Sequence, residues 1–282
     1  MVVMKYATPF PMLHAASLLS HRSRLSKFQR ALQKVVRPES RVVDIGTGTG
    51  VLALIAARAG AKSVTAVDVN RESLNYARKA AEINGLSQRV SFIEAHFEDY
   101  VPEEQADIVV CEMLSSMLLI EQQVQACAHA AKRILKPGGI ILPASASVYA
   151  VPVECHSLWE RFGLLDLEFP KVPQTLGKGD AKDLSDAVLI AKFDFSTPDI
   201  PAEVNEMLEY TIVEDGVLHG LAGFFKSLLY ENITLGMDDG WRELFLPLDE
   251  PIGVFKGARV SIQLRFKPGK FDSLKLSRPA IS

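Results

Sequence analysis

Hydrophobic and polar positions change their spacing twice along this chain of 282 residues. Residues 12–36 carry apolar side chains at helical spacing, with basic residues between them, and this run ends at Arg37-Pro38. We therefore expect residues 1–36 to form an N-terminal helical cap.

From residue 41 to residue 142, short apolar runs alternate with longer amphipathic segments. The apolar runs predict strands over 41–44, 63–68, 90–94, 106–111 and 139–142. The amphipathic segments predict helices over 51–59, 71–84 and 122–135. Such alternation is typical of a parallel sheet with crossover helices. The sequence thus predicts an α/β, Rossmann-like domain over residues 37–143.

Beyond residue 143 the runs become short, rich in β-branched and aromatic residues, and separated by Gly, Pro and Asp. They cover 148–153, 187–195, 207–213, 217–229, 233–237, 243–248 and 259–266. This texture predicts a β-barrel-like domain over 144–282, either a barrel or a sandwich. The stretch 159–185 lacks the pattern and predicts an irregular insertion.

The chain's clearest motif is a glycine-rich turn between a predicted strand and a predicted helix. Gly46, Gly48 and Gly50 follow Asp44, and Asp68 closes the next apolar run. The spacing lacks the third glycine of the dinucleotide-binding pattern, while an acid at the second strand end suits a ribose diol. The motif therefore favours a turn that binds a ribose-containing cofactor. The alternatives to this interpretation are a tight turn without a ligand and a nucleotide-dependent oxidoreductase.

Two acids flank an uncharged segment after the strand 106–111. Glu112 and Glu121 are separated by eight residues without a charge, residues 113–120. Two carboxylates over a cofactor are costly to ionise without a partner, and a cationic substrate relieves this cost. A guanidinium fits best, because its planar fork meets carboxylates in two-point contacts.

These motifs together resemble those of the class I S-adenosylmethionine-dependent methyltransferases, and Glu112 and Glu121 fall on the double-glutamate loop of the protein arginine N-methyltransferases. The resemblance implies an S-adenosyl-L-methionine cofactor, a catalytic role for both glutamates, an arginine side chain of a protein as substrate, and a homodimer formed through an arm. It also implies a cofactor site built from Arg24 at the cofactor carboxylate, Asp44 near the amino-acid end, Gly46, Gly48, Gly50, Asp68 at the ribose, and His96, Phe97 and Glu98 around the adenine.

The chain departs from that family at two places. Leu114-Ser115-Ser116 stands where the family usually has Met-Gly-Tyr, and Asp239-Gly240-Trp241 stands where it usually has Thr-His-Trp. Two further hypotheses therefore stay open. One is a methyltransferase for another acceptor, a small amine, another protein side chain or RNA. The other is a non-catalytic methyltransferase-like interaction protein.

Composition limits the binding partners and the cellular compartment that suit this chain. The formal net charge is −3, so no global basic field favours nucleic acid. Three cysteines without ligand spacing predict neither a disulfide framework nor a metal site, and they favour a cytoplasmic protein. No apolar run reaches membrane-spanning length, and residues 1–5 lack the layout of a signal peptide.

Overall fold

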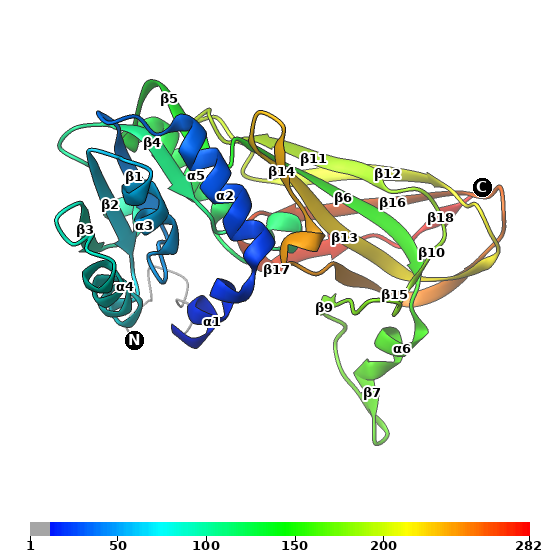
Figure 1. Ribbon diagram of the computed structural model, residues 1–282. Coiled ribbons are helices and arrows are strands. Elements are labelled where there is room, and N and C mark those ends of the chain that lie inside the picture. The colour runs from blue at the N-terminus through cyan, green and yellow to red at the C-terminus, as the bar shows by residue number, and fades with distance from the viewer. Residues whose placement is uncertain (1–11) are drawn as a thin grey trace.

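The computed structural model describes residues 12–282 and consists of two units joined side by side (Figure 1). A parallel sheet with its helices forms the first unit. Antiparallel strands form the second unit, which extends away from the first. Residues 1–11, which belong to the predicted cap and bear on the predicted absence of a signal peptide, lie outside the described residues.

The predicted N-terminal helix is broken into three pieces. Helix α1 (Met12–Ser17) and the 3-10 turn η1 (Leu18–Ser20) precede α2 (Arg22–Val35), and the break falls at His21, whose backbone is non-helical. In α2, Phe28, Leu32 and Val35 are buried at helical spacing, as the sequence predicts. The helix contacts α3 on one side and strands β13 and β14 on the other, so it connects the two units.

The first unit is a five-stranded sheet in the order β3-β2-β1-β4-β5. Its strands are β1 (Arg41–Ile45), β2 (Ser63–Asp68), β3 (Val90–Glu94), β4 (Ala106–Cys111) and β5 (Leu135–Leu142), and all neighbouring pairs are parallel. Helices α3 (Val51–Arg58), α4 (Arg71–Ile83) and α5 (Gln123–His129) connect them. The strand order reverses at β1 and β4, and ligand crevices of such sheets open at the carboxyl ends of the strands there.

One predicted helix is shorter than expected. Helix α5 ends at His129, and a π-helical turn, η4 (Ala130–Ile134), leads directly into β5. Strand β5 therefore begins at Leu135, which pairs with Ala106, and not at residue 139. The apolar pattern of this segment does not distinguish a helical turn from the start of a buried strand.

The second unit contains two antiparallel sheets. The larger, seven-stranded sheet has the central order β10-β6-β13-β15-β9, with β11 beside β6 and β14 beside β13. Its strands are β6 (Ser145–Glu154), β9 (Gln174–Thr175), β10 (Lys182–Asp183), β11 (Val188–Asp194), β13 (Gly216–Tyr230), β14 (Ile233–Leu235) and β15 (Leu244–Val254). The smaller sheet contains β12 (Val204–Thr211), β16 (Arg259–Lys267), β17 (Lys270–Leu276) and β18 (Ala280–Ile281).

The two sheets share one apolar core. Along β16, Val260, Ile262, Leu264 and Phe266 are buried at alternate positions, as expected for a strand with one solvated face. Within residues 12–282 the hydrogen-bonded pairing does not close into a barrel, because β11 pairs with β6 and β12 pairs with β16 without a ladder between β11 and β12. The predicted β unit is present, therefore, as two sheets.

The predicted irregular insertion contains regular structure. After α6 (His156–Trp159) and the 3-10 turn η5 (Glu160–Phe162), β7 (Gly163–Leu164) and β8 (Leu167–Glu168) form a small hairpin. This hairpin points away from both units (Figure 1). The chain then returns to the larger sheet through β9 and β10. No helix in residues 12–282 has the length and apolarity that a membrane crossing requires.

Candidate active site

The glycine-rich turn lies at the carboxyl end of β1 and leads into α3. Gly46, Gly48 and Gly50 all have positive φ angles, 70°, 51° and 76°. At Gly50 a side chain is excluded for a second reason, since an added Cβ would lie 2.7 Å from the Cβ of Ala77. The glycine spacing therefore reflects both backbone conformation and close packing against α4.

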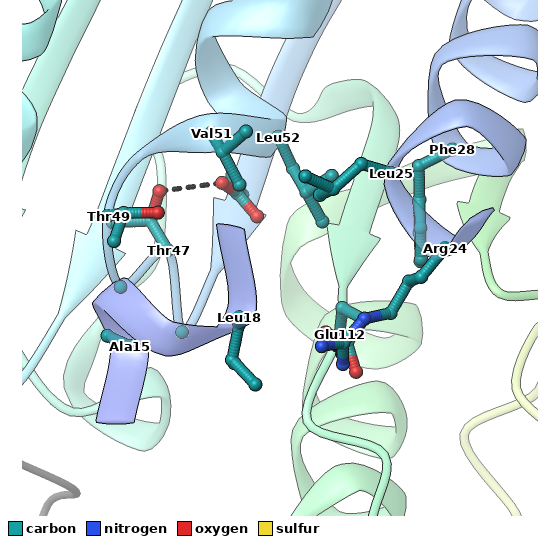
Figure 2. A pocket seen from close by; sticks show the side chains of 13 residues that line it. Ala15, Leu18, Arg24, Leu25, Phe28, Thr47, Thr49, Val51, Leu52 and Glu112 are labelled. Carbon is teal, nitrogen blue, oxygen red and sulfur yellow. Dashed lines mark hydrogen bonds and ion pairs between the residues drawn. The ribbon is translucent and has the colours of Figure 1, made fainter. Parts of the chain in front are cut away.

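Asp44 is buried directly beneath this turn. Its Oδ2 accepts a hydrogen bond from the Thr47 hydroxyl at 2.6 Å (Figure 2). It accepts another from the backbone N–H of Ala53 at 3.1 Å. Burial raises the pKa of Asp44 to about 7, although both hydrogen bonds act in the opposite direction. A cation placed near this carboxylate would favour its ionised form.

Asp68, at the carboxyl end of β2, connects the two strand ends. Its Oδ2 accepts from the backbone N–H of Gly48 at 2.8 Å, and its Oδ1 accepts from Asn70 at 2.8 Å. Burial raises its pKa, against the effect of these hydrogen bonds. Each oxygen of a carboxylate has two lone pairs, so both oxygens can still accept from a diol.

A cavity of about 430 Å3 joins most of the predicted site residues. Its lining includes Gly46, Gly48, Asp68, His96, Phe97, Glu112 and Glu121. Arg24 and Asp44 line a smaller neighbouring pocket that shares Gly46, Gly48 and Glu112 with the cavity (Figure 2). Gly50 lines neither pocket. Cofactor sites span roughly 300–1,000 Å3, so the cavity has a size that suits a nucleoside-bearing cofactor.

His96 and Phe97 form one wall of the cavity, and their rings lie 4.2 Å apart. The Nδ1 atom of His96 accepts from the backbone N–H of Glu98 at 3.3 Å, so Nε2 carries the proton and donates to Gln122 Oε1 at 3.2 Å. Glu98 itself does not line the cavity, and its side chain is 53% exposed. The Glu98 carboxylate thus lies outside the cavity lining, while its Oε2 is 3.9 Å from Nδ1 of His96.

Glu112 follows β4 and pairs with Arg24 from α2. Arg24 Nη1 donates to Glu112 Oε2 at 3.1 Å, and the two side chains are only 4% and 12% exposed. The backbone N–H of Leu114 donates to the other carboxylate oxygen at 3.3 Å. Burial raises the pKa of Glu112, and the charge of Arg24 opposes this shift. The ion pair thus holds Glu112 at the cavity wall.

Glu121 lies on the same cavity without an ion-pair partner among residues 12–282. Burial and the nearby charge of Glu112 raise its pKa to about 8, and Arg24 offsets only part of this shift. Glu112 and Glu121 therefore face the same cavity as Asp68, and Arg24 partly compensates the charge of the two glutamates. This arrangement favours a cationic ligand between them.

The loop between these glutamates is held by contacts that sequence reasoning did not identify. Ser115 Oγ accepts the backbone N–H groups of Ile120 at 3.1 Å and Glu121 at 3.2 Å, so it fixes the backbone that carries the Glu121 carboxylate. Met117 has a φ of 60° and is fully buried, where its side chain occupies the space above Gly223. Only Ser115 gave a signal in the sequence, as a departure from the family's glycine.

A buried glutamine also supports this site. Gln123 Nε2 donates to the carbonyl oxygen of Cys111 at 2.8 Å, and its Oε1 accepts from the backbone N–H of Met113 at 2.7 Å. These two bonds enclose Glu112 and hold the end of β4 in place. Nothing in the local sequence distinguishes Gln123 from the neighbouring glutamines, and it therefore went unnoticed.

Comparisons with known proteins match each unit to a protein family. Residues 28–148 match the family described as "Ribosomal protein L11 methyltransferase (PrmA)", and residues 145–268 match the family "PRMT5 oligomerisation domain". A "Probable protein arginine N-methyltransferase 6" of Arabidopsis thaliana is 35% identical over 48% of this chain and 32% of its own length. The chain thus spans about a third of the length of that relative.

Other matches cover more of the chain. An "Arginine N(omega)-methyltransferase" of Streptomyces achromogenes is 27% identical over 90% of this chain and 76% of its own length. The structure of Trypanosoma brucei PRMT1, described as an enzyme-prozyme heterotetrameric complex with AdoHcy, has a TM-score of 0.79 over 96% of each chain, at 19% identity. This last likeness concerns the fold. The predicted resemblance is confirmed: the chain has the fold and sequence features of S-adenosylmethionine-dependent methyltransferases that are similar to the protein arginine N-methyltransferases.

Proposed function

We propose that this chain, which resembles the protein arginine N-methyltransferases in sequence and fold, transfers the methyl group of S-adenosylmethionine to a guanidinium nitrogen of an arginine side chain in a protein. We place the helical cap at residues 1–36, the cofactor domain at 37–143 and the β domain at 144–282. Glu112 and Glu121 are the proposed acceptor-binding residues.

The arrangement of the two glutamates carries this proposal. Glu112 and Glu121 line one cavity, and burial raises the pKa of both. Arg24 satisfies one carboxylate oxygen of Glu112, while Glu121 has no ion-pair partner in the described chain. A guanidinium offers five N–H donors in one plane and a permanent charge, so it supplies what this pair lacks.

The residues around the glycine turn fit the cofactor. We propose that Asp68 accepts from the ribose, that Arg24 and Asp44 bind the amino-acid end, and that His96 and Phe97 flank the adenine. Gly46 and Gly48 line this surface, Gly50 completes the turn that carries them, and we propose that Glu98 lies near the adenine edge. When bound, the cofactor supplies an activated sulfonium methyl group.

The chemistry left to the protein is alignment and charge placement. A guanidinium is protonated at all ordinary pH values, so its weak nucleophilicity is the difficulty. Contacts from Glu112 and Glu121 would concentrate positive charge on the nitrogens they bind and leave electron density on the remaining nitrogen. Fixed approach of the reacting groups supplies the rest of the rate enhancement.

A second candidate acceptor is free arginine. The name of the Streptomyces achromogenes relative specifies arginine itself, and that relative covers most of this chain. The same pair of carboxylates would bind the guanidinium of a free amino acid. The two acceptors differ in size and in the charges next to the guanidinium, so they can be separated by direct assay.

Purified protein with labelled S-adenosylmethionine tests the proposal. We expect transfer to an arginine-containing peptide and none to the same peptide with lysine in place of arginine. Transfer to free arginine alone would favour the second candidate. Glu112→Gln and Glu121→Gln are the test variants, and Glu103→Gln, an exposed carboxylate away from the cavity, is the matched control. Equal transfer by all four proteins would contradict the proposed role of the glutamates.

We also propose a homodimer formed through the β7–β8 hairpin. Leu164, Leu165 and Leu167 are 62%, 85% and 60% exposed on it. The match of residues 145–268 to an oligomerisation domain supports this proposal. Light scattering on wild type and on Leu165→Asp tests it: a dimer that dissociates in the variant is expected, and an unchanged mass would contradict it.

The proposed location is the cytoplasm. Cys111, Cys127 and Cys155 are all free and buried, and free thiols persist best in a reducing compartment. Cell fractionation with an antibody to this chain tests the location, and recovery from an oxidising compartment would contradict it.

A further inference from the structure

We propose that Asp239 is a positioning residue that fixes Arg24, and through it Glu112, by anchoring helix α2 to the loop before β15. This inference rests on the proposed function, because it assigns Arg24 to the cofactor's carboxylate. It concerns the segment 237–241, where the sequence lacks the histidine of the resembled family.

Asp239 is 3% exposed and has three hydrogen-bond donors around its carboxylate. The Ser23 hydroxyl donates to Oδ1 at 2.5 Å, Lys27 Nζ donates to Oδ2 at 2.7 Å, and the backbone N–H of Gly236 donates to Oδ2 at 3.0 Å. Burial by itself would raise the pKa of Asp239, but the bonds from Lys27 and Ser23 outweigh it and lower the pKa. The carboxylate is therefore held in its charged form.

The two donors on α2, Ser23 and Lys27, lie on either side of Arg24 in the sequence. Ser23 precedes it and Lys27 lies one turn later, four residues after Ser23, so both face the same loop. A carboxylate that binds both residues fixes the rotation of the helix about its axis at this turn. Rotation of this turn would move the Arg24 guanidinium away from Glu112.

The same loop contacts Arg24 and the glutamate loop directly. The Arg24 guanidinium carbon lies 4.4 Å from the ring centroid of Trp241. Trp241 Nε1 donates to the carbonyl oxygen of Leu114 at 2.7 Å, two residues after Glu112. Asp239 and Trp241 thus connect one short loop to α2 and to the chain that carries Glu112.

The turn between them closes tightly on α2. Gly240 has a φ of 111°, and an added Cβ would lie 2.6 Å from Cγ of the His21 ring. The Nδ1 atom of His21 in turn accepts from Arg24 Nη2 at 2.5 Å. Arg24 therefore contacts Glu112, His21 and Trp241. Asp239 holds the loop that carries Trp241 against the start of α2, where His21 lies.

Two ligands that differ only at the amino-acid end test this role. S-adenosylhomocysteine carries the carboxylate, whereas 5′-methylthioadenosine keeps the adenosine and the sulfur and lacks it. For Asp239→Asn we expect affinity for S-adenosylhomocysteine to fall by at least about ten-fold, as for loss of a hydrogen bond to a charged group. Affinity for 5′-methylthioadenosine should change by less than about two-fold.

Asp238→Asn is the matched control, since this neighbouring carboxylate is exposed, and it should bind both ligands like wild type. Ser23→Ala and Lys27→Met remove the same contacts from the helix side and provide the test if Asp239→Asn fails to fold. Equal loss for both ligands in these variants, or no loss for either, would overturn the inference.

A readout without ligand separates this inference from the proposed function. In nitrogen-15 spectra, the guanidinium signal of Arg24 should shift or broaden in Asp239→Asn and stay unchanged in Asp238→Asn. An unchanged Arg24 signal in both would overturn the positioning role. If wild type binds neither ligand, the proposed cofactor site fails, and the Arg24 signal still decides the role of Asp239.

Discussion

Arg24 Nη1 lies 3.1 Å from Glu112 Oε2, and both side chains are almost excluded from solvent. This pair connects α2 to the strand end of β4, so one contact joins the proposed cofactor and acceptor sites. Glu121, which faces the same cavity as Glu112, has no ion-pair partner in residues 12–282. This unequal distribution of charge supports the proposed binding of a cationic acceptor.

The first prediction concerns Glu112. Glu112→Gln keeps the size of the side chain and removes the charge that faces the acceptor. We expect it to bind S-adenosylhomocysteine and to lower the rate constant for transfer by about 100-fold or more, as for loss of one electrostatic contact in an active site. Calorimetry and a methyl-transfer assay measure the two effects. Strong turnover by Glu112→Gln would remove Glu112 from the mechanism.

The second prediction concerns the pH dependence of acceptor binding. Glu121 has a pKa of about 8 in the folded chain, above its ordinary value of 4.5. Its protonated form therefore stabilises the fold, and this contribution is complete below pH 4.5 and lost as the pH rises through about 8. A guanidinium favours the ionised carboxylate, so its binding should release a proton and tighten as the pH approaches 8.

Calorimetry in two buffers of different ionisation enthalpy measures that proton release. The variant Glu121→Gln should bind the guanidinium acceptor more weakly and with less pH dependence. A pH profile shared by wild type and Glu121→Gln would show that another group titrates.

The third prediction concerns the fit between Met117 and Gly223. A Cβ at Gly223 would overlap the Met117 side chain, so Gly223→Ala should lower the free energy of unfolding by about 1–3 kcal/mol. In a Met117→Ala background, which lacks the overlapping atoms, Gly223→Ala should cost less than it does in wild type. Gly253→Ala is the control, since nothing lies within 4 Å of its added Cβ. Denaturant unfolding of wild type, the two single variants, the double variant and the Gly253→Ala control decides whether the two sites are coupled.

The fourth prediction concerns Ser115. Without its hydroxyl, the N–H groups of Ile120 and Glu121 lose their acceptor, which costs about 1–3 kcal/mol for a buried donor. Ser115→Ala should raise the KM for the acceptor and leave the affinity for S-adenosylhomocysteine unchanged. Ser116→Ala is the comparison, because that hydroxyl donates to the carbonyl oxygen of Arg242. An equal rise in KM for both variants would argue against a specific role for Ser115.

Local patterns predicted most of the first unit and its glycine turn. The motif from Asp44 to Gly50 is contiguous, and Asp68 ends the next strand, so spacing alone brings them to one sheet edge. Sequence reasoning assigned Arg24 to the cofactor and did not identify its pairing with Glu112, which joins residues 88 positions apart. Such a contact depends on how α2 packs, and periodicity carries no information about it.

For the second unit, the sequence predicted the presence of strands and did not predict which strands pair. Strand runs were recognisable, but alternation does not reveal which strands pair, so two sheets and a closed barrel have the same signature. Asp239 illustrates the same limit. Its partners Ser23 and Lys27 lie more than 200 positions earlier, and the motif comparison identified only a missing histidine.

The identity of the methylated atom tests the central claim most directly. Labelled S-adenosylmethionine and the purified chain are added to a lysate of the host organism, and the product is hydrolysed in acid and identified. The account predicts labelled methylarginine, lost when Glu112→Gln replaces wild type. Label on another amino acid or on RNA would contradict the acceptor, and no label despite cofactor binding would contradict the proposed activity.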